Sequence, residues 1–454
     1  MKINFEENKI IKSFDGSSFK QPLTYKPFNK NAINHLNQKE TIPRGSCTSY
    51  ILACSDKNGI SVDMSEFNLI RSFNKENGEL KIQSGIQIRT IINFLESKGF
   101  IFPVVPGNPY ATIGGAVAAN VHGKNSYLKG VIYDHITSLN LLLRNSENIE
   151  CYPGDPLFEA TIGGFGITGI ILEVTIKCIR SKNNSVKITN YKINSIKEAG
   201  LALPNLTKHD YLYSFHRSSN LIKNTSGFII AADYVYQKKS NKQLHISKYL
   251  DKENAYLTNP FLKMNKRGAC IWNQFTIDLA QTLFIIKSKI KLKKTLFLDE
   301  FYFPLDQFKT YYSLFGVKGF LETQVLIPIH KWESYCDNFI KITSKHKLSA
   351  TVLSLKLFDG DNRLISFSGK GISLTADFPY SEKALKALNE MDKLNCEFGV
   401  KSNIIKDRRL CSNIVSQQYD TESFKTLLNI CQENIYGPDK FRPNQSELLK
   451  RIIK

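Results

Sequence analysis

The sequence lacks the patterns of several protein classes. None of its apolar stretches reaches the about 20 residues of a membrane-spanning helix. Glu6 and Glu7 stand where a signal peptide would need an apolar run. Nine cysteines are scattered from Cys47 to Cys431 without a CxxC pair, so we predict neither a disulfide framework nor a zinc site. We therefore expect a cytoplasmic protein with reduced thiols, peripheral at most to the inner membrane.

Several catalytic signatures are also missing. The chain has no Walker A motif, no GxSxG elbow and no HExxH helix. Its glycine clusters do not form a GxGxxG turn placed after a strand and opening a helix, which disfavours a Rossmann site. These absences argue against P-loop nucleotide hydrolysis, the α/β-hydrolases and zinc proteolysis, and we predict no bound metal.

The composition is that of a globular protein. Of 454 residues, 42% are hydrophobic and 22% are charged, and this length predicts two domains rather than one core. The net charge of +20 fits compositional drift, or an acidic partner such as nucleic acid, an anionic membrane or a phosphorylated substrate. Because the positive charge is spread along the chain, we favour drift and expect no nucleic-acid partner.

Periodicity predicts strands alternating with short helices after a polar, irregular stretch of about forty residues. Apolar residues at helical spacing follow Ile88, and Gly99 closes that helix. The expected strands span residues 79–84, 136–143, 149–152 and 171–178. The polar run 180–185 marks a domain boundary.

Two later segments have less regular patterns. Residues 237–254 are rich in Lys, Ser and Asn and predict a loop. Residues 279–298 mix apolar side chains with Lys287, Lys289, Lys291, Lys293 and Lys294. That mixture suits a membrane-docking segment, but the apolar positions do not form one clean stripe, so we favour a partly buried helix or strand.

Two glycine clusters carry the functional information, at residues 106–125 and 161–171. Glycine lets the backbone approach a ligand and adopt positive φ, and the exposed N–H groups can hold a pyrophosphate. Either cluster alone fits a pair of tight turns between strands equally well.

Together the two clusters resemble the FAD domain shared by vanillyl alcohol oxidase, para-cresol methylhydroxylase and the sugar-lactone oxidases. A third element, PRGSCTSY at residues 43–50, stands where that superfamily has its pyrophosphate loop. The HGKN of residues 122–125, the downstream His135 and the TIGGFGITGII string are most similar to the decaprenylphosphoryl-ribose oxidases. Further motifs in the same order lie at residues 301–306, 319–328, 356–358, 377–379 and 405–409. The resemblance covers about residues 20 to 450.

The resemblance implies an α+β flavoprotein of two domains. We expect an FAD-binding domain of the para-cresol-methylhydroxylase type at residues 15–182 and an antiparallel-sheet substrate domain at 183–400. Residues 401–454 would return to the FAD domain. The implied reaction is oxidation of a secondary alcohol of a sugar, a polyprenyl-phosphate-linked pentose, to a ketone. This would be the first half of an epimerisation for cell-envelope polysaccharide, completed by a short-chain NAD(P)-dependent reductase.

Two alternatives stay open: an aldonolactone or free-sugar oxidase, and a non-catalytic descendant that has lost its flavin. The resemblance also implies site residues. The expected cofactor-binding residues are Arg44, Gly45, Ser46, Cys47, Ser49, Tyr50, Pro106, Gly107, Gly114, Gly115, His122, Gly123, Gly166, Gly169, Ile171 and Lys406. The expected catalytic residues are Lys406, His122, Glu322, Gln324 and Lys356, with Phe358 and Thr375 facing the substrate.

The chain departs from the family pattern at five positions. Cys47 and Ile51 replace glycines in the pyrophosphate loop, which adds a Cβ where backbone freedom is usual. Thr48 stands where the lactone oxidases carry a flavin-linked histidine, so we expect non-covalent FAD. Glu322 replaces a glutamine and Thr375 a cysteine of the decaprenylphosphoryl-ribose enzymes, which predicts a different substrate pocket.

Overall fold

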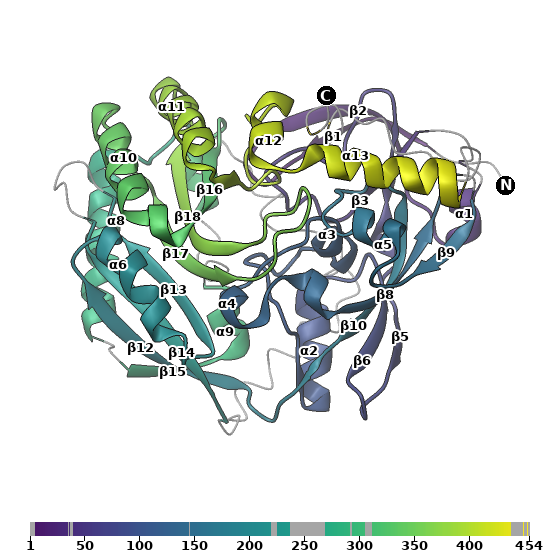
Figure 1. The fold of residues 1–454 in the computed structure, drawn as a ribbon, viewed down its shortest axis with the longest axis horizontal. Helices are drawn as coiled ribbons and strands as arrows, with labels where there is room; N and C mark the ends of the chain where they lie inside the picture. Colours follow the sequence, from purple (N-terminus) through teal and green to yellow (C-terminus); the bar gives the residue numbers. More distant parts are fainter. Residues whose placement is uncertain are drawn as a thin grey trace.

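The computed structural model describes residues 5–34, 36, 40–144, 146–218, 225–236, 268–290, 293–304, 311–436, 448 and 452 (Figure 1). The loop expected at 237–254 lies outside the described residues, as do Lys291 and the side chains of Lys287, Lys289 and Lys293.

A four-stranded sheet opens the chain, with the strand order β1-β2-β4-β3. Its strands are β1 (Glu6–Lys12), β2 (Ser18–Tyr25), β3 (Thr41–Arg44) and β4 (Ile60–Asp63), with the short helix α1 (Lys30–Asn34) between β2 and β3. β1 and β2 form an antiparallel hairpin, whereas β4 runs parallel to both β2 and β3. The expectation of an irregular N-terminus is therefore wrong. Cross-strand pairing, which composition does not reveal, orders these polar residues.

A five-stranded antiparallel sheet follows, in the order β5-β6-β10-β8-β9. Its strands are β5 (Ile70–Phe73), β6 (Glu79–Gln83), β8 (Ile136–Leu142), β9 (Asn148–Cys151) and β10 (Ile170–Lys177). Helix α2 (Ile88–Lys98) ends at Gly99, whose φ of 75° is the left-handed conformation that glycine allows. The four strands and the helix expected in this region are confirmed to within one or two residues. The remaining elements are β7 (Phe100–Ile101) paired with β11 (Ile179–Arg180), α3 (Ile113–Ala118), α4 (Ser126–Lys129) and α5 (Pro156–Thr161).

Two further four-stranded antiparallel sheets form the other half of the molecule, on the left in Figure 1. One contains β12 (Ser185–Ile193), β13 (Tyr211–His216), β14 (Gly227–Val235) and β15 (Lys293–Phe297). The other contains β16 (Phe320–Ile327), β17 (Val352–Asp359), β18 (Lys370–Pro379) and β19 (Lys401–Ser402). Helices α6 (Ile196–Ala202), α8 (Gln274–Ile290), α9 (Leu298–Tyr302), α10 (Trp332–Lys345) and α11 (Glu382–Phe398) surround them. Helices and mainly antiparallel sheets confirm the α+β class, while the domain limits at 182 and 400 stay a prediction.

The sheet of β16, β17 and β18 separates polar from apolar side chains. Leu321, Val325, Leu355 and Leu374 are buried in one core with α10 and α11. The alternate positions of the three strands include Glu322, Gln324, Ser354, Lys356, Phe358, Ser373, Thr375 and Asp377. Because successive residues of a strand point to opposite faces, these eight share the face turned away from that core.

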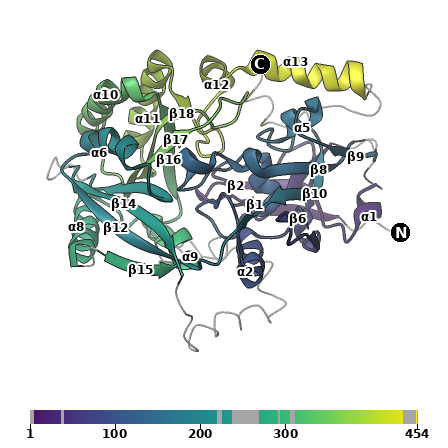
Figure 2. The same cartoon turned by 60° about the horizontal axis from the view of Figure 1, so that its bottom comes forward.

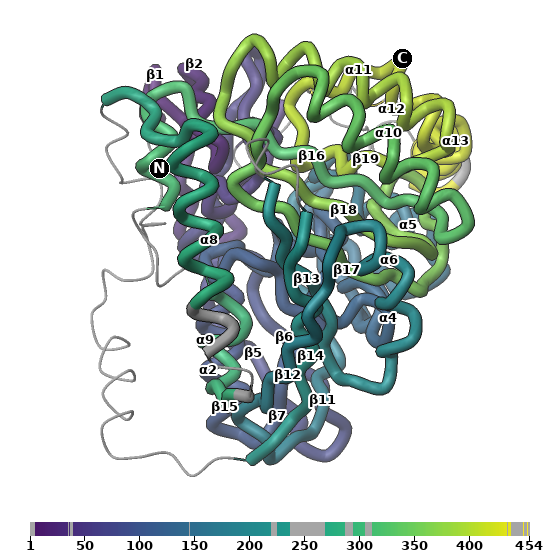
Figure 3. Tube along the Cα trace, turned by 90° about the vertical axis from the view of Figure 1, so that its left-hand side faces the viewer, coloured from purple at the N-terminus to yellow at the C-terminus, as the bar shows by residue number. Residues whose placement is uncertain are grey.

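Helix α8 runs along the outside of the molecule (Figure 3). Its inner face buries Ile277 and Gln281, and the Gln281 amide donates to the Ala350 carbonyl at 2.8 Å. Its outer face carries Phe275, Leu279 and Leu283, four residues apart and each at least half exposed. The preference for a partly buried helix over residues 279–290 agrees with these contacts, and the exposed Phe284 lies off the row of Phe275, Leu279 and Leu283. Among the described residues, no helix is long and apolar enough to cross a membrane.

The C-terminal helices α12 (Ser412–Gln418) and α13 (Thr421–Asn429), with the π-helix Ile430–Ile435, cross back over the first half of the chain (Figure 2). Phe424 and Leu428 of α13 share a core with Leu157 and Phe158 of α5. The 3₁₀ turns are Met64–Glu66, Ile132–His135, Leu203–Leu206, Tyr312–Phe315 and Ile329–Lys331.

Candidate active site

The three glycine segments meet in the structure. A Cβ added at Gly45 would lie 2.3 Å from Oγ1 of Thr112, the residue that caps the N-terminus of α3. Gly166 has a φ of 83°, and its added Cβ would lie 3.0 Å from Pro43. The backbone N–H groups of Gly163 and Phe165 donate to carbonyls of α3 at 3.1 and 2.8 Å. Segments distant in the sequence therefore form one surface, with glycine where a Cβ would crowd a residue of the neighbouring segment.

Parts of this surface are open to a ligand. A Cβ at Gly107 would meet no atom within 4 Å, and one at Gly115 would meet only Thr112 Oγ1, at 3.2 Å. A cleft of about 500 Å³, open solvent included, is lined by Gly166, Gly169 and Ile170, and by Glu40 and Arg144. These features fit the extended pyrophosphate and adenine parts of FAD. Ile171, also expected there, is buried in the core and does not line the cleft.

The remaining expected cofactor residues lie around this surface. Gly114 and Gly123 are tightly packed, because an added Cβ would lie 2.7 Å from Ser84 and 2.6 Å from Asn125 Oδ1. Ser46 and Ser49 are on the loop after β3, and Pro106 precedes Gly107 on the segment before α3. Arg44 is held by an ion pair with Asp63 at 2.9 Å and therefore orients the start of that loop.

The loop after β3 ends beside the C-terminal segment. The Tyr50 N–H donates to the Ile405 carbonyl at 3.1 Å, and Lys406 Nζ lies 4.2 Å from the centre of the Tyr50 ring. Tyr50 also packs against Phe14 and Phe320. Lys406 thus stands between the expected cofactor loop and the polar face of β16–β18.

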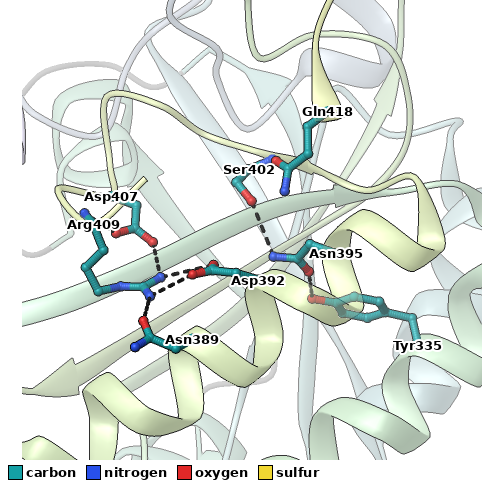
Figure 4. A network of polar contacts seen from close by, with 8 residues as sticks. All are labelled: Tyr335, Asn389, Asp392, Asn395, Ser402, Asp407, Arg409 and Gln418. Carbon is teal, nitrogen blue, oxygen red and sulfur yellow. Dashed lines mark hydrogen bonds and ion pairs between the residues drawn. The ribbon is translucent and has the colours of Figure 1, made fainter. Parts of the chain in front are cut away.

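Lys406 is not paired with its neighbour Asp407. Its ammonium lies 2.9 Å from Oε1 of the buried Glu322, while Asp407 accepts from Arg409. Arg409 also donates to Asp392 and Asn389 of α11, and Asn395 joins Ser402 to Tyr335 (Figure 4). This network fastens the segment that carries Lys406 to α11.

Glu322 and Asp377 form a buried carboxyl pair. They are direct partners across β16 and β18, and each is 5% exposed. Burial, and next the negative charge of Glu322, raise the pKa of Asp377 well above its ordinary value, against the opposing effect of Lys406. This raised pKa favours the protonated form of Asp377 beside the Glu322 carboxyl group.

The side-chain amides of Asn403 and Gln324 fix the orientation of the His122 ring. Asn403 Nδ2 donates to Gln324 Oε1 at 2.8 Å, and Gln324 Nε2 lies 3.0 Å from His122 Nε2. This arrangement makes Nε2 an acceptor and puts the proton on Nδ1, which is buried and has no hydrogen-bond partner among the described residues. Burial, then the charges of Lys356 and Lys406, lower the pKa of His122 well below its ordinary value, so the ring is neutral. Nδ1 is therefore a donor that fits a ligand.

Two more lysines complete the cluster. Burial, then Lys406, lower the pKa of Lys356 to about 8, against the effect of Glu322. Lys124 donates to the carbonyls of Phe301 and Tyr302 at 2.5 and 2.9 Å, and burial lowers its pKa well below the usual lysine value. Lys124 was not among the expected site residues, although it belongs to the HGKN motif, and Asp377 was missed although it begins the DFP motif.

The expected substrate residues lie on the same face. Phe358 packs against the His122 ring, with 5.0 Å between their centres, and Thr375 pairs with Gln324 across the sheet. Cys47 is apart from this cluster and lies beside Cys54. No group of three His, Cys, Asp or Glu residues in the described part of the chain could hold a metal ion.

Comparison with known proteins supports this geometry. A family model described as an FAD binding domain matches residues 31–152. Decaprenylphosphoryl-beta-D-ribose oxidase of Mycolicibacterium smegmatis is 28% identical over 416 residues, 88% of both chains. D-lactate dehydrogenase of Anaerostipes hadrus is 29% identical over 160 residues, 34% of both chains. The mitochondrial D-lactate dehydrogenase [cytochrome] 1 of Saccharomyces cerevisiae is 28% identical over 188 residues, 39% of this chain and 32% of the yeast protein.

The region matched by the family model contains two of the three converging glycine segments, and the longest match covers 88% of the chain. The chain is therefore an FAD-dependent oxidoreductase acting on CH–OH groups, and it is similar to FAD-linked oxidases and dehydrogenases.

Proposed function

We propose that the chain oxidises a secondary alcohol of a sugar to a ketone, and that the sugar is a pentose linked to a polyprenyl phosphate. The observation that carries this proposal is the polar face of β16–β18, which presents ammonium, carboxyl and amide groups beside Tyr50. A sugar has several hydroxyl groups, each of which needs a partner when it is buried. The end-to-end match with an oxidase named for a polyprenylphosphoryl ribose supports this substrate class.

FAD held by the loop after β3 and the segment before α3 would supply the acceptor for the hydride of the carbinol carbon. Lys406 holds the substrate oxygen and offsets the negative charge that develops in the site. The hydroxyl proton passes to the Glu322 carboxylate, whose partner Asp377 already carries a proton. The carbon loses a hydrogen with its electron pair and the oxygen loses a proton, which leaves the ketone.

Other groups of the cluster hold the remaining hydroxyls. His122 donates from Nδ1, and Gln324 and Asn403 keep its ring in the orientation this requires. Lys356 donates to a second hydroxyl, and Phe358 closes the pocket behind His122. Thr375 gives this pocket a hydroxyl opposite Gln324, and thereby helps to select the sugar.

We propose that FAD is held without a covalent bond, because Thr48 offers no side chain suited to linkage at the position of the flavin-linked histidine. Denaturing the yellow protein with acid or heat and separating the polypeptide tests this. Flavin in the supernatant is expected, and flavin that stays with the precipitated polypeptide would contradict it.

The substrate proposal is tested by anaerobic bleaching of the bound flavin. A panel of polyprenyl-phospho-pentoses, free sugars and aldonolactones is added to the holoenzyme, and the loss of oxidised-flavin absorbance is timed. The lipid-linked pentose is expected to bleach fastest. Faster bleaching by a lactone or a free sugar would favour the alternative oxidase, and a flavin that dithionite reduces but no sugar bleaches would contradict sugar oxidation.

We further propose that a short-chain NAD(P)-dependent reductase completes the epimerisation. The described cluster provides for one oxidation, so the purified chain alone should accumulate the ketone. Product analysis of the reaction with the purified chain tests this. Formation of the epimeric alcohol without any added reductase would contradict the proposal.

A further inference from the structure

Two cysteines that are seven residues apart in sequence meet in the structure. The sulfur atoms of Cys47 and Cys54 are 3.6 Å apart, and neither cysteine is in a disulfide. Both residues are partly exposed, although their sulfur atoms lie in a buried environment. A disulfide brings the sulfurs to about 2.05 Å, a small movement from this separation.

The surroundings make the two thiols chemically different. The hydrogen bond with Cys54 lowers the pKa of Cys47 most; the nearby Arg44 guanidinium lowers it further, while burial and Asp63 raise it. The same hydrogen bond, and next burial, raise the pKa of Cys54 well above its ordinary value, although Arg44 opposes this. Cys47 is therefore the more acidic thiol of the pair and the one that more readily forms a thiolate.

The position of Cys47 is unusual for a side chain. Its φ of 53° lies in the left-handed region, which costs an L-residue about 1–2 kcal/mol. Glycine would relieve this conformation, so a cysteine stands here against the backbone preference. Replacement by glycine consequently removes the sulfur without straining the loop.

We propose that Cys47 and Cys54 form an oxidation site for hydroperoxides. The Cys47 thiolate attacks one oxygen of the peroxide bond; an S–O bond forms, the O–O bond breaks, and the released alkoxide or hydroxide takes up a proton. The Cys54 sulfur then attacks the sulfenic sulfur of Cys47, the S–O bond breaks, and water leaves with the Cys54 proton. Both thiols are oxidised by one peroxide, and the product is a disulfide in the loop between β3 and β4.

The other described cysteines lack this arrangement. Cys151, Cys178, Cys336 and Cys431 have a pKa raised chiefly by burial, which keeps them protonated. Cys270 is exposed, and burial of part of its thiol raises its pKa as well. Oxidation should therefore be selective for the Cys47–Cys54 pair.

The test uses the purified chain, reduced and freed of reductant, with hydrogen peroxide as the probe. The intact mass should fall by two hydrogens, two of the nine thiols should disappear, and peptide mapping should find residues 47 and 54 cross-linked. Cys47→Gly should keep both its fold and its remaining thiols. Cys54→Ser should stop at a sulfenic acid on Cys47, which dimedone captures. Cys270→Ser is the matched control and should cross-link as the wild type does.

Loss of two thiols from Cys47→Gly at the wild-type rate would overturn the proposal. Dimedone labelling of Cys270 or Cys411 while the pair stays reduced would overturn it as well. Failure of Cys54→Ser to yield a labelled Cys47 would remove Cys47 as the attacking thiolate.

Discussion

The ammonium of Lys406 lies 2.9 Å from the carboxylate of Glu322 and 4.2 Å from the Tyr50 ring. This relationship joins the C-terminal segment, the central strand β16 and the loop after β3 at one cation. The Arg409 network holds the backbone behind it, so the charge is positioned before any ligand binds (Figure 4).

Lys406→Ala should keep FAD and lose most flavin reduction. Removing one positioned donor from a reacting centre costs about 2.7–4 kcal/mol, a factor of about 10² to 10³ in rate. Stopped-flow reduction under anaerobic conditions measures the loss, and flavin absorbance confirms occupancy. Lys370→Ala, which breaks a surface ion pair with Asp359, is the control. Near-normal reduction in Lys406→Ala would give this lysine a structural role only.

Glu322→Gln should slow flavin reduction at neutral pH by about 10²-fold or more, the usual contribution of a general base. The groups that face Glu322 are Lys406, Tyr50, Asp377 and Tyr312. Asp377→Asn imitates the protonated partner and should keep most activity. A wild-type rate of flavin reduction in Glu322→Gln would exclude Glu322 as the base.

The local sequence pattern predicted more of the secondary structure of the expected FAD-binding domain than of the contacts in the active site. Glycine spacing and alternation placed α2, β6, β8, β9 and β10, because these elements depend on nearby residues. The register of β16 against β18 brings Glu322 to Asp377, and a loop fold brings Cys47 to Cys54. Neither contact can be predicted from the spacing of residues along the chain.

Resemblance supplied Lys406, Gln324 and Lys356 as expected site residues, and the structure gathers all three. It also supplied Glu322, but not the ion pair of Glu322 with Lys406, because a glutamine is usual at position 322. The environment of a substituted residue depends on contacts distant in sequence, which a motif does not contain. The buried Lys124 was missed for the same reason, since its partners are carbonyls of residues 301 and 302.

Lys356→Met should stabilise the fold at pH 7. The pKa of Lys356 falls from 10.5 to about 8 in the folded chain, so between these pH values the unfolded chain binds more protons. Wild-type stability therefore rises with pH across this window. The advantage of the methionine variant, at most about 3 kcal/mol at 1.36 kcal/mol per pKa unit, should shrink above pH 8. Thermal melts at pH 7 and 9.5 check this, with Lys386→Met on α11 as the exposed control. A gain in stability of Lys356→Met that does not change with pH would contradict the lowered pKa of Lys356.

Gly107→Ala should weaken FAD binding without destabilising the flavin-free protein. A Cβ at Gly107 meets no protein atom within 4 Å, so only a ligand in that space would feel it. Gly360→Ala is the matched control, since its Cβ is equally unobstructed and lies on the loop after β17. Flavin titration and melting of the stripped proteins measure both effects. Equal FAD affinity in the two variants would show that the cofactor does not contact Gly107.

The last prediction concerns the apolar stripe of α8, which we define as Phe275, Leu279 and Leu283. These side chains are 68%, 50% and 59% exposed on one face of a helix held to the body by Ile277 and Gln281. If the substrate lipid stays in a bilayer, the enzyme must come to it, and a surface of this kind can enter the headgroup region. The exposed Lys294 follows in β15, and each lysine near an anionic surface adds about 1 kcal/mol.

Vesicle co-sedimentation measures this contact. Binding should require anionic lipid, weaken with salt, and fall when Phe275, Leu279 and Leu283 are changed to serine. Replacing Lys287, Lys289, Lys291, Lys293 and Lys294 by glutamine should remove the salt-sensitive part. The matched control changes Leu69, Leu128 and Leu201 to serine, because these are exposed leucines scattered over other elements. Equal sedimentation of the stripe variant and the wild type would exclude α8 from membrane contact. The flavin chemistry would be unaffected, because the stripe shares no residue with the Lys406 cluster.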